Sequence, residues 1–335
     1  MPPNSTSLQT THDEPVLTVK DVYKTYTLSK GQTLKAVDGI SFSVMSGEVL
    51  GLVGESGCGK STLGRCLLRL HDVTSGQIIF EGQDITHLPE RTLRPLRQRM
   101  QMVFQDSYAS LNPRRRIGEL LAEPLKVHGT ANGERRSASA ITQRLAELME
   151  LVSLPRAALA RYPHEFSGGQ RQRINIARAL ALSPRLIVAD EPVSALDVSV
   201  QAQIVNLFAD LQKQLGRTYV FVAHDLAVVR QISTRVAVMY LGAIVELGET
   251  DNVLHHSAHP YTIALTQAVP RPVVGTPQHA PLRGEIPSPV HKPSGCRFHA
   301  RCPAVQARCA HDAPQLRPIA PNHEVACHYP VLSHN

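Results

Sequence analysis

The 335-residue sequence has no tryptophan, only 4% aromatic residues, and no apolar run long enough to span a bilayer. A membrane-spanning helix needs about 20 predominantly apolar residues. The best candidate, 228–247, is interrupted by Arg230, Arg235 and Glu246. The first residues, 1–11, are polar and lack the apolar centre of a secretory signal. We therefore expect a protein that is cytosolic or is held at a membrane by a partner.

The sequence also lacks the pattern of a nucleic-acid surface, although its net charge is +7. The densest basic patches are short, at 91–99 and 114–116, and no aromatic residues interleave with them. A surface for single-stranded nucleic acid needs such residues as stacking platforms. A surface near acidic lipid or another protein explains the patches equally well. We therefore expect no nucleic-acid partner.

One stretch, 54–62, has the sequence of a phosphate-binding loop, Gly-Glu-Ser-Gly-Cys-Gly-Lys-Ser-Thr. It follows the apolar run 49–53 and precedes leucines at helical spacing, which is the order strand, glycine-rich turn, helix. Glycines let successive backbone N–H groups converge on phosphate oxygens, and the helix N-terminus adds partial positive charge. We expect Lys60 to reach the β- and γ-phosphates of a nucleotide and the Ser61 hydroxyl to bind Mg²⁺. The predicted nucleotide-binding residues of this loop are Gly54, Ser56, Gly57, Cys58, Gly59, Lys60, Ser61 and Thr62.

An acidic pair, Asp190 and Glu191, follows the apolar strand predicted at 186–189. An aspartate at the carboxyl end of such a strand has the Walker B pattern, which binds Mg²⁺ directly or through water. Glu191 is placed to act as the general base for an attacking water, a role worth about 10²–10⁴-fold in rate. Asp and Glu are also common turn residues. The phosphate-binding loop upstream favours the functional interpretation.

Two further polar residues, Gln105 and His224, follow apolar strands predicted at 100–104 and 219–223. The carboxyl ends of strands in this kind of sheet face the ligand crevice. Gln105 is in position to reach the metal or the attacking water, and we interpret His224 as a γ-phosphate sensor. Each residue alone would more often be an ordinary loop or structural side chain. The acidic pair on the same edge favours a functional role.

The segment 167–170, Ser-Gly-Gly-Gln, predicts a helix start, because Ser167 and Gln170 have the spacing of a capping box. Capping alone accounts for the serine and the glutamine. It does not account for Gly168 and Gly169, since each glycine costs a helix about 1 kcal/mol. Two glycines at a helix start leave backbone N–H groups open to an anion. We therefore predict a second phosphate-binding site in the chain.

Tyr26 is the aromatic residue nearest to the predicted strand at 40–44 on its N-terminal side. It is in position to stack on an adenine ring. The alternative is a half-buried strand tyrosine, which periodicity alone favours.

The order of these motifs, completed by Ser-Ala-Leu-Asp at 194–197, resembles that of an ABC transporter ATPase subunit over residues 15–247. The resemblance implies an α/β P-loop NTPase (RecA-like) core with an N-terminal antiparallel β subdomain and a small Pro/Cys-rich C-terminal extension. It implies an ATPase domain at 15–250, with a helical insertion at about 106–178, and an extension at 251–335.

The resemblance also implies that two ATPase domains pair head to tail, with each ATP between one Walker A loop and the partner's signature helix. Ser167 and Gly169, with Gly168 and Gln170, would then serve the partner's ATP. Asp197 would be the D-loop residue and Tyr26 the adenine-stacking aromatic. The Walker A, Walker B and Q-loop assignments would make Ser61, Asp190 and Gln105 the Mg²⁺ ligands. The catalytic residues would be Glu191, the H-loop residue His224 and Gln105.

Four segments, 108–114, 162–166, 259–262 and 284–298, resemble the dipeptide/oligopeptide importer group, especially its second ATPase subunit. The resemblance implies a heterodimer with a paralogous ATPase subunit, on the cytoplasmic face of the cell membrane. It also implies two transmembrane permease subunits and an extracytoplasmic peptide-binding protein. Nickel importers share this layout, so the solute stays open. A soluble ABC protein remains the alternative, although those usually carry two cassettes or a long coiled-coil insertion.

Four cysteines, Cys296, Cys302, Cys309 and Cys327, follow a proline-rich stretch at 270–293 that we interpret as an extended linker. In a reducing compartment, clustered cysteines indicate a metal site rather than disulfides. Their gaps of five, six and seventeen residues lack the short spacing of structural zinc sites. A 4Fe–4S cluster is one interpretation, because some members of the importer group carry one in this region. A zinc site and free thiols are the other two interpretations.

Overall fold

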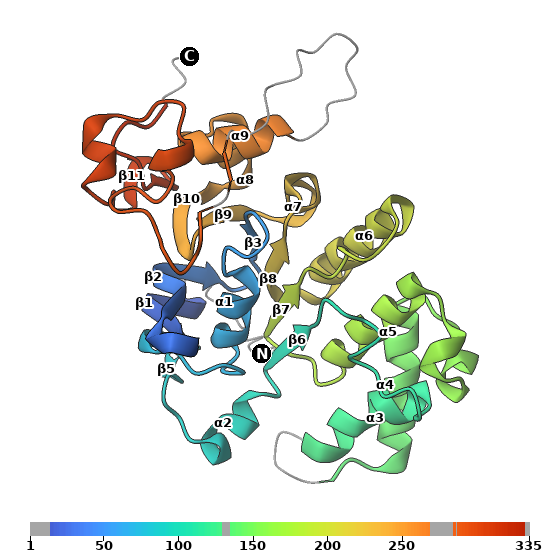
Figure 1. Ribbon diagram of the computed structural model, residues 1–335. Coiled ribbons are helices and arrows are strands. Elements are labelled where there is room, and N and C mark those ends of the chain that lie inside the picture. The colour runs from blue at the N-terminus through green and yellow to red at the C-terminus, as the bar shows by residue number, and fades with distance from the viewer. Residues whose placement is uncertain (1–13, 129–134, 269–283, 286, 332–335) are drawn as a thin grey trace, which may run out of the picture.

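The computed structural model describes residues 14–128, 135–268, 284–285 and 287–331 (Figure 1). Residues 1–13 and most of the predicted proline-rich linker lie outside the described residues. Within the described residues, no helix combines the length and apolarity that crossing a membrane would require.

The central sheet has the strand order β11-β12-β10-β9-β3-β8-β7-β6. Its five strands from β9 to β6 are parallel, and β10, β12 and β11 extend it by antiparallel pairing. In sheet order the strands are Arg317–Ala320 (β11), His323–Val325 (β12), Ala243–Glu249 (β10), Arg235–Tyr240 (β9), Val49–Val53 (β3), Thr218–Ala223 (β8), Leu186–Asp190 (β7) and Met100–Val103 (β6). The strands β3, β7 and β8 are buried at every residue, as expected for parallel strands covered on both faces.

The second sheet is antiparallel, with the order β2-β1-β4-β5. Its strands are Thr33–Met45 (β2), Pro15–Thr27 (β1), Ser75–Phe80 (β4) and Gln83–Asp84 (β5). Both it and one face of the central sheet pack on the helix Lys60–Leu67 (α1), and together they form a continuous apolar core. This sheet confirms the predicted N-terminal antiparallel β subdomain.

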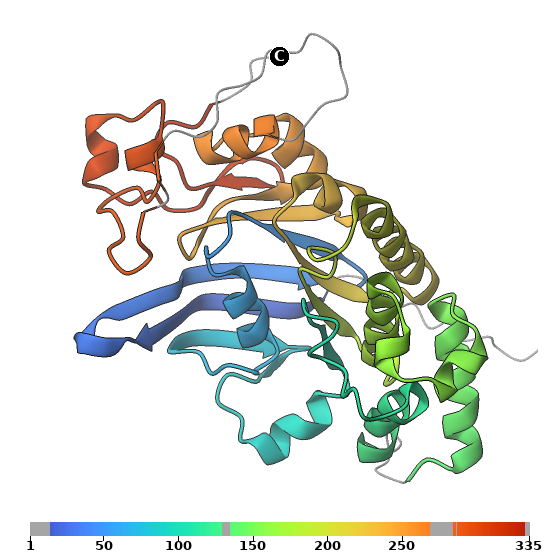
Figure 2. The same cartoon turned by 45° about the vertical axis from the view of Figure 1, so that its right-hand side comes forward.

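The helix Glu90–Leu96 (α2) precedes β6. A helical region follows β6 and confirms the predicted insertion. It contains Ile117–His128 (α3), Ala138–Leu151 (α4) and Gly168–Leu180 (α5), with 3₁₀ turns at Arg156–Ala160 and Pro163–Glu165. Figure 2 shows α3, α4 and α5 at one end of the molecule and the C-terminal extension at the other, with the sheets between them.

The remaining helices cover the face of the central sheet opposite the one on which α1 packs. They are Val198–Leu215 (α6), Leu226–Ile232 (α7), Thr250–His255 (α8) and Pro260–Ala268 (α9), and short 3₁₀ turns lie at Ser29–Gly31, His299–Arg301 and Ala307–Ala310. The extension is built into the cassette, because β12 pairs with β10 and Phe298 belongs to the same apolar core as α6 and β8.

Candidate functional site

The phosphate-binding loop joins β3 to α1, as predicted. Gly59 has φ of 106° and Gly54 has φ of 152°, a backbone region that L-residues rarely adopt. A Cβ atom at Gly59 would lie 2.1 Å from the carbonyl oxygen of Ala36, and one at Gly54 would lie 2.1 Å from that of Met239. These two positions therefore require glycine both for conformation and for space.

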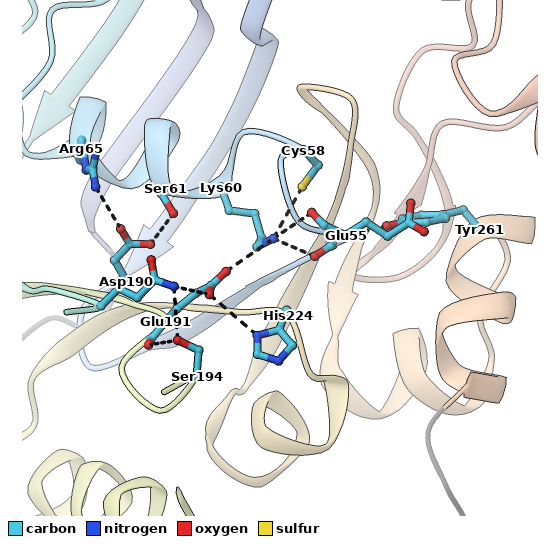
Figure 3. A network of polar contacts seen from close by, with 12 residues as sticks. Glu55, Cys58, Lys60, Ser61, Arg65, Asp190, Glu191, Ser194, His224 and Tyr261 are labelled. Carbon is cyan, nitrogen blue, oxygen red and sulfur yellow. Dashed lines mark hydrogen bonds and ion pairs between the residues drawn. The ribbon is translucent and has the colours of Figure 1, made fainter. Parts of the chain in front are cut away.

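Lys60 is the first residue of α1 and its side chain is buried. Its Nζ donates hydrogen bonds to the carbonyl oxygens of Gly54 (2.7 Å) and Glu55 (3.0 Å). The same Nζ lies 3.9 Å from Oε1 of Glu191 (Figure 3). The loop thus holds an ammonium group at its centre, facing the predicted general base.

Ser61 and Asp190 are brought together from α1 and the end of β7. Ser61 Oγ donates a hydrogen bond to Asp190 Oδ1 at 2.7 Å, and Arg65 Nη2 lies 4.0 Å from Oδ2. Asp190 is 1% exposed, and this burial raises the pKa of its carboxyl group. A hydroxyl and a carboxylate oxygen in contact are the hard ligands that Mg²⁺ prefers, so the residues present fit this ion.

Glu191 is the centre of a polar cluster at the carboxyl edge of the sheet (Figure 3). Gln105 Nε2 donates a hydrogen bond to Glu191 Oε2 at 3.0 Å and lies 3.4 Å from Ser194 Oγ. His224 Nδ1 lies 3.9 Å from the same Glu191 oxygen, and the imidazole is 53% exposed. Three neighbouring strands, β6, β7 and β8, therefore deliver the predicted residues to one point.

The phosphate-binding loop, Gln105 and Glu191 line one cavity of about 270 Å³. Ser194 and His224 instead line a smaller neighbouring pocket that shares Glu191 with it. The described residues that line the larger cavity are Tyr26, Leu34, Lys35, Ala36, Ser56, Gly57, Cys58, Gly59, Lys60, Ser61, Thr62, Gln105, Glu191, Leu241, Gly242 and Pro289. Sequence reasoning missed the residues at 34–36, 241–242 and 289, because no local motif marks them. They come from strand β2, the β9–β10 turn and the C-terminal extension.

The position of Tyr26 is compatible with both roles that the sequence left open, a half-buried strand tyrosine and an adenine-stacking ring. It lies on strand β1, half-buried, and it also lines the cavity. Its hydroxyl and His71 Nδ1 are 3.0 Å apart in a hydrogen bond, and Lys24 Nζ lies 4.9 Å from the ring centroid. Stacking of this ring on adenine stays a prediction.

The predicted second phosphate site starts helix α5. Ser167 Oγ accepts a hydrogen bond from the Gln170 N–H at 3.3 Å, and Gln170 Oε1 accepts one from the Ser167 N–H at 3.1 Å, which confirms the capping box. A Cβ at Gly169 would lie 2.5 Å from Val200 Cγ1, and one at Gly168 would lie 3.3 Å from Leu196 Cδ2. Close packing against α6 is therefore a reason for Gly169 that the sequence argument did not consider.

This helix start lies away from the cavity just described. Among the described residues, neither Ser167–Gln170 nor Asp197, the N-cap of α6, lines that cavity, and Figure 1 shows α5 well separated from α1. Ser167, Gln170 and Asp197 are exposed. The predicted second phosphate site is therefore separate from the cavity around Lys60.

The four predicted metal-ligating cysteines line one small cavity together with Phe298 and three histidines, His259, His299 and His328. All four are free thiols, and burial raises the pKa of Cys327 to about 11. Among the described residues, however, no group of three His, Cys, Asp or Glu side chains could hold a metal ion. A metal centre at these cysteines, whether a cluster or zinc, therefore stays a prediction, with free thiols as its alternative. Cys58 and Cys66 are buried apart from this cavity.

Comparison with known proteins agrees with the site. The ABC transporter family pattern matches residues 37–194, and the pattern of the oligopeptide/dipeptide transporter C-terminal region matches residues 245–309. The chain is 49% identical to the oligopeptide transport ATP-binding protein AppF of Bacillus subtilis (strain 168), over 95% of this chain and 98% of that protein. It is 50% identical to a putative peptide import ATP-binding protein of Brucella ovis, over 94% of this chain and 98% of that protein.

A solved structure is similar over the cassette. It is a dimeric, post-hydrolysis state of the ATP-binding cassette MJ0796 bound to ADP and phosphate, with a TM-score of 0.63 and 28% identity over 70% of this chain and 98% of that chain. These similarities confirm the predicted α/β ABC cassette fold. The chain belongs to the family of ABC transporter ATP-binding proteins that carry the oligopeptide/dipeptide transporter C-terminal region.

Proposed function

We propose that this protein binds and hydrolyses ATP to energise the import of dipeptides or oligopeptides, by closure of a head-to-tail dimer of cassettes. The observation that carries the proposal is the convergence of Lys60, Ser61 and Glu191 around one cavity, with Asp190 in contact with Ser61. The printed functions of the two relatives support the peptide as the solute.

In this proposal, the residues act on the triphosphate as follows. The loop N–H groups and Lys60 bind the phosphates. Ser61 and Asp190, with Gln105, would hold Mg²⁺, which supplies charge neutralisation at the phosphate oxygens. Glu191 accepts a proton from the attacking water, and Gln105 and His224, both beside its carboxylate, orient that water.

The signature surface at Ser167–Gln170, with Asp197, would complete the ATP site of a paralogous ATPase subunit. The separation of this surface from the chain's own cavity supports the pairing, because a lone cassette has no use for it. The dimeric form of the similar cassette supports it as well. The complex would include two transmembrane permease subunits and an extracytoplasmic binding protein, with this chain on the cytoplasmic face of the membrane.

Transport by the reconstituted complex tests this function. The chain is purified with its paralogous ATPase and permease subunits and placed in liposomes, and uptake of labelled dipeptide, tetrapeptide and Ni²⁺ is compared with and without ATP. We expect ATP-dependent peptide uptake. Uptake of Ni²⁺ without uptake of peptide would identify nickel as the solute in place of peptides. Failure of the chain to associate with any permease would overturn the proposal.

We also propose an iron–sulfur cluster in the four-cysteine cavity. Its support is the donor set, four free thiols around one cavity, which suits a cluster held from several sides better than a single ion. The iron and sulfide content and the visible absorption of anaerobically purified protein test this. A colourless protein without iron would end the proposal.

A further inference from the structure

The C-terminal extension reaches the phosphate-binding loop through one ion pair. Arg301 Nη1 donates to Glu55 Oε2 at 2.7 Å, and Arg301 Nη2 donates to Glu55 Oε1 at 3.0 Å. This two-bond geometry is the strongest that arginine makes with a carboxylate. The side chains are 5% and 20% exposed, respectively, so solvent screens the pair much less than a surface ion pair.

Aromatic rings hold the guanidinium in place. Its carbon lies 5.9 Å from the ring centroid of Tyr240 and 6.0 Å from that of Phe298, and Nη1 also lies 3.4 Å from the Tyr240 hydroxyl. The Tyr240 and Phe298 rings are edge-to-face with centroids 5.3 Å apart. Arg301 is therefore a fixed group and not a mobile surface side chain.

Glu55 in turn is tied to Lys60. The Glu55 N–H donates to the hydroxyl of Tyr261 at 2.9 Å, and its carbonyl oxygen accepts the hydrogen bond from Lys60 Nζ (Figure 3). The side chain and the N–H of Glu55 are thus held by residues near the C-terminal end of the chain. Its carbonyl helps to place the lysine that we propose binds the phosphates.

The extension touches the nucleotide cavity at a second point. Pro289 lines this cavity, and Lys292 Nζ donates to the carbonyl oxygen of Lys35 at 2.7 Å and to Asp38 Oδ2 at 3.1 Å. Lys35 also lines the cavity. The extension therefore contacts the cavity wall both at the phosphate-binding loop and at β2.

We propose that Arg301 is a positioning residue for ATP binding, through which the C-terminal extension holds the phosphate-binding loop in its phosphate-accepting conformation. This inference rests on the proposed function, that ATP binds at this loop. Arg301 also cancels the charge of Glu55, an acid that lies within the loop. Without Arg301, the loop would carry an unpaired carboxylate next to Ser56, which lines the cavity proposed to bind a polyanion, in surroundings where water screens the charge only in part.

The test uses the full-length chain and the fluorescent nucleotide trinitrophenyl-ATP with Mg²⁺. We expect Arg301→Met to weaken nucleotide binding by about tenfold or more, a change of ~1.4 kcal/mol per factor of ten. Adding Glu55→Gln to that variant removes the repelling charge, so the double variant should bind more tightly than Arg301→Met alone. Arg301→Lys, which keeps the charge without the two-bond geometry, should lie between wild type and Arg301→Met.

The matched control is Arg308→Ala, which removes an exposed arginine of the same extension that pairs with Asp312. It should leave nucleotide binding unchanged. Thermal unfolding of every variant separates stability from binding, and Arg301→Lys serves if Arg301→Met does not fold. Normal nucleotide affinity in folded Arg301 variants, or a double variant no better than Arg301→Met, would overturn the inference. A wild-type chain that does not bind nucleotide would instead overturn the proposed function.

Discussion

Ser61 Oγ donates a hydrogen bond to Asp190 Oδ1 over 2.7 Å, although the two residues are 129 positions apart in the sequence. The serine is fixed by the start of α1 and the aspartate by the end of β7. Each motif alone predicts a Mg²⁺ ligand. Their contact shows that the two motifs belong to one site.

Removal of this hydroxyl should weaken metal binding. We expect Ser61→Ala to lower the apparent Mg²⁺ affinity of the ATPase by about 10–100-fold, as loss of groups around metal sites does. ATPase rates measured against free Mg²⁺ check this. Ser61→Thr keeps the hydroxyl and serves as the control; an unchanged Mg²⁺ dependence in Ser61→Ala would remove this residue from the metal site.

Replacement of Glu191, the proposed general base, should separate ATP binding from ATP turnover. Glu191→Gln keeps the size of the side chain and its contact with Gln105 but cannot accept the proton, so hydrolysis should fall by about 10²–10⁴-fold. ATP should still bind, and the cassette dimer should persist in ATP and Mg²⁺ during gel filtration. Near-normal hydrolysis in this variant would contradict the role of Glu191.

Replacing a glycine of the phosphate-binding loop should damage binding and stability more than replacing a glycine elsewhere. Gly59→Ala adds a Cβ that meets the Ala36 carbonyl at 2.1 Å, so it should abolish nucleotide binding and lower the melting temperature. Gly216→Ala, at the end of α6, also changes a positive-φ glycine, but nothing lies within 4 Å of the added atom. It should cost only about 1–2 kcal/mol of unfolding free energy and leave binding intact. Equal effects of the two changes would contradict the steric argument.

Stability should fall as the solution becomes acidic. His259 is fully buried, and burial lowers its pKa to about 4 from 6.5, although the Glu246 carboxylate opposes the shift. Between these values the unfolded chain binds a proton that the folded chain does not, so this histidine contributes stability above pH 6.5 that is lost toward pH 4. The loss is of the order of 3 kcal/mol.

Urea unfolding at pH 7, 5.5 and 4.5 checks this prediction. In His259→Gln, the free energy of unfolding should decrease less over this range than in wild type. His256→Gln, a change at a neighbouring histidine, should show the same decrease as wild type. A pH dependence that is identical in wild type and His259→Gln would assign the decrease to other groups.

The sequence predicts the site where chemistry is local. Asp190 and Glu191 could be assigned because they stand at the end of a short apolar strand, and strand ends of a parallel sheet meet at one edge. Lys60 could be assigned because it follows a glycine-rich loop at the start of a helix. The sequence explains the need for Gly169 only in part, because its contact with Val200 depends on how α5 packs on α6.

Other parts of the site have no local signal. Pro289 and Arg301 are more than 200 residues from the loop that they brace. The extension that carries them joins the central sheet through β12, a strand of only three residues that pairs with β10. Such long-range pairing is set by tertiary packing and not by the residues of the strand itself.

The same short strand has a consequence for the handling of this protein. In the structure, β12 and then β11 cover the outer edge of β10. A chain shortened before residue 317 would leave the main-chain groups of β10 unpaired, and an exposed edge of this kind invites pairing with another molecule. Truncations made to isolate the nucleotide-binding part should therefore aggregate, and the intact C-terminal end protects the cassette from that outcome.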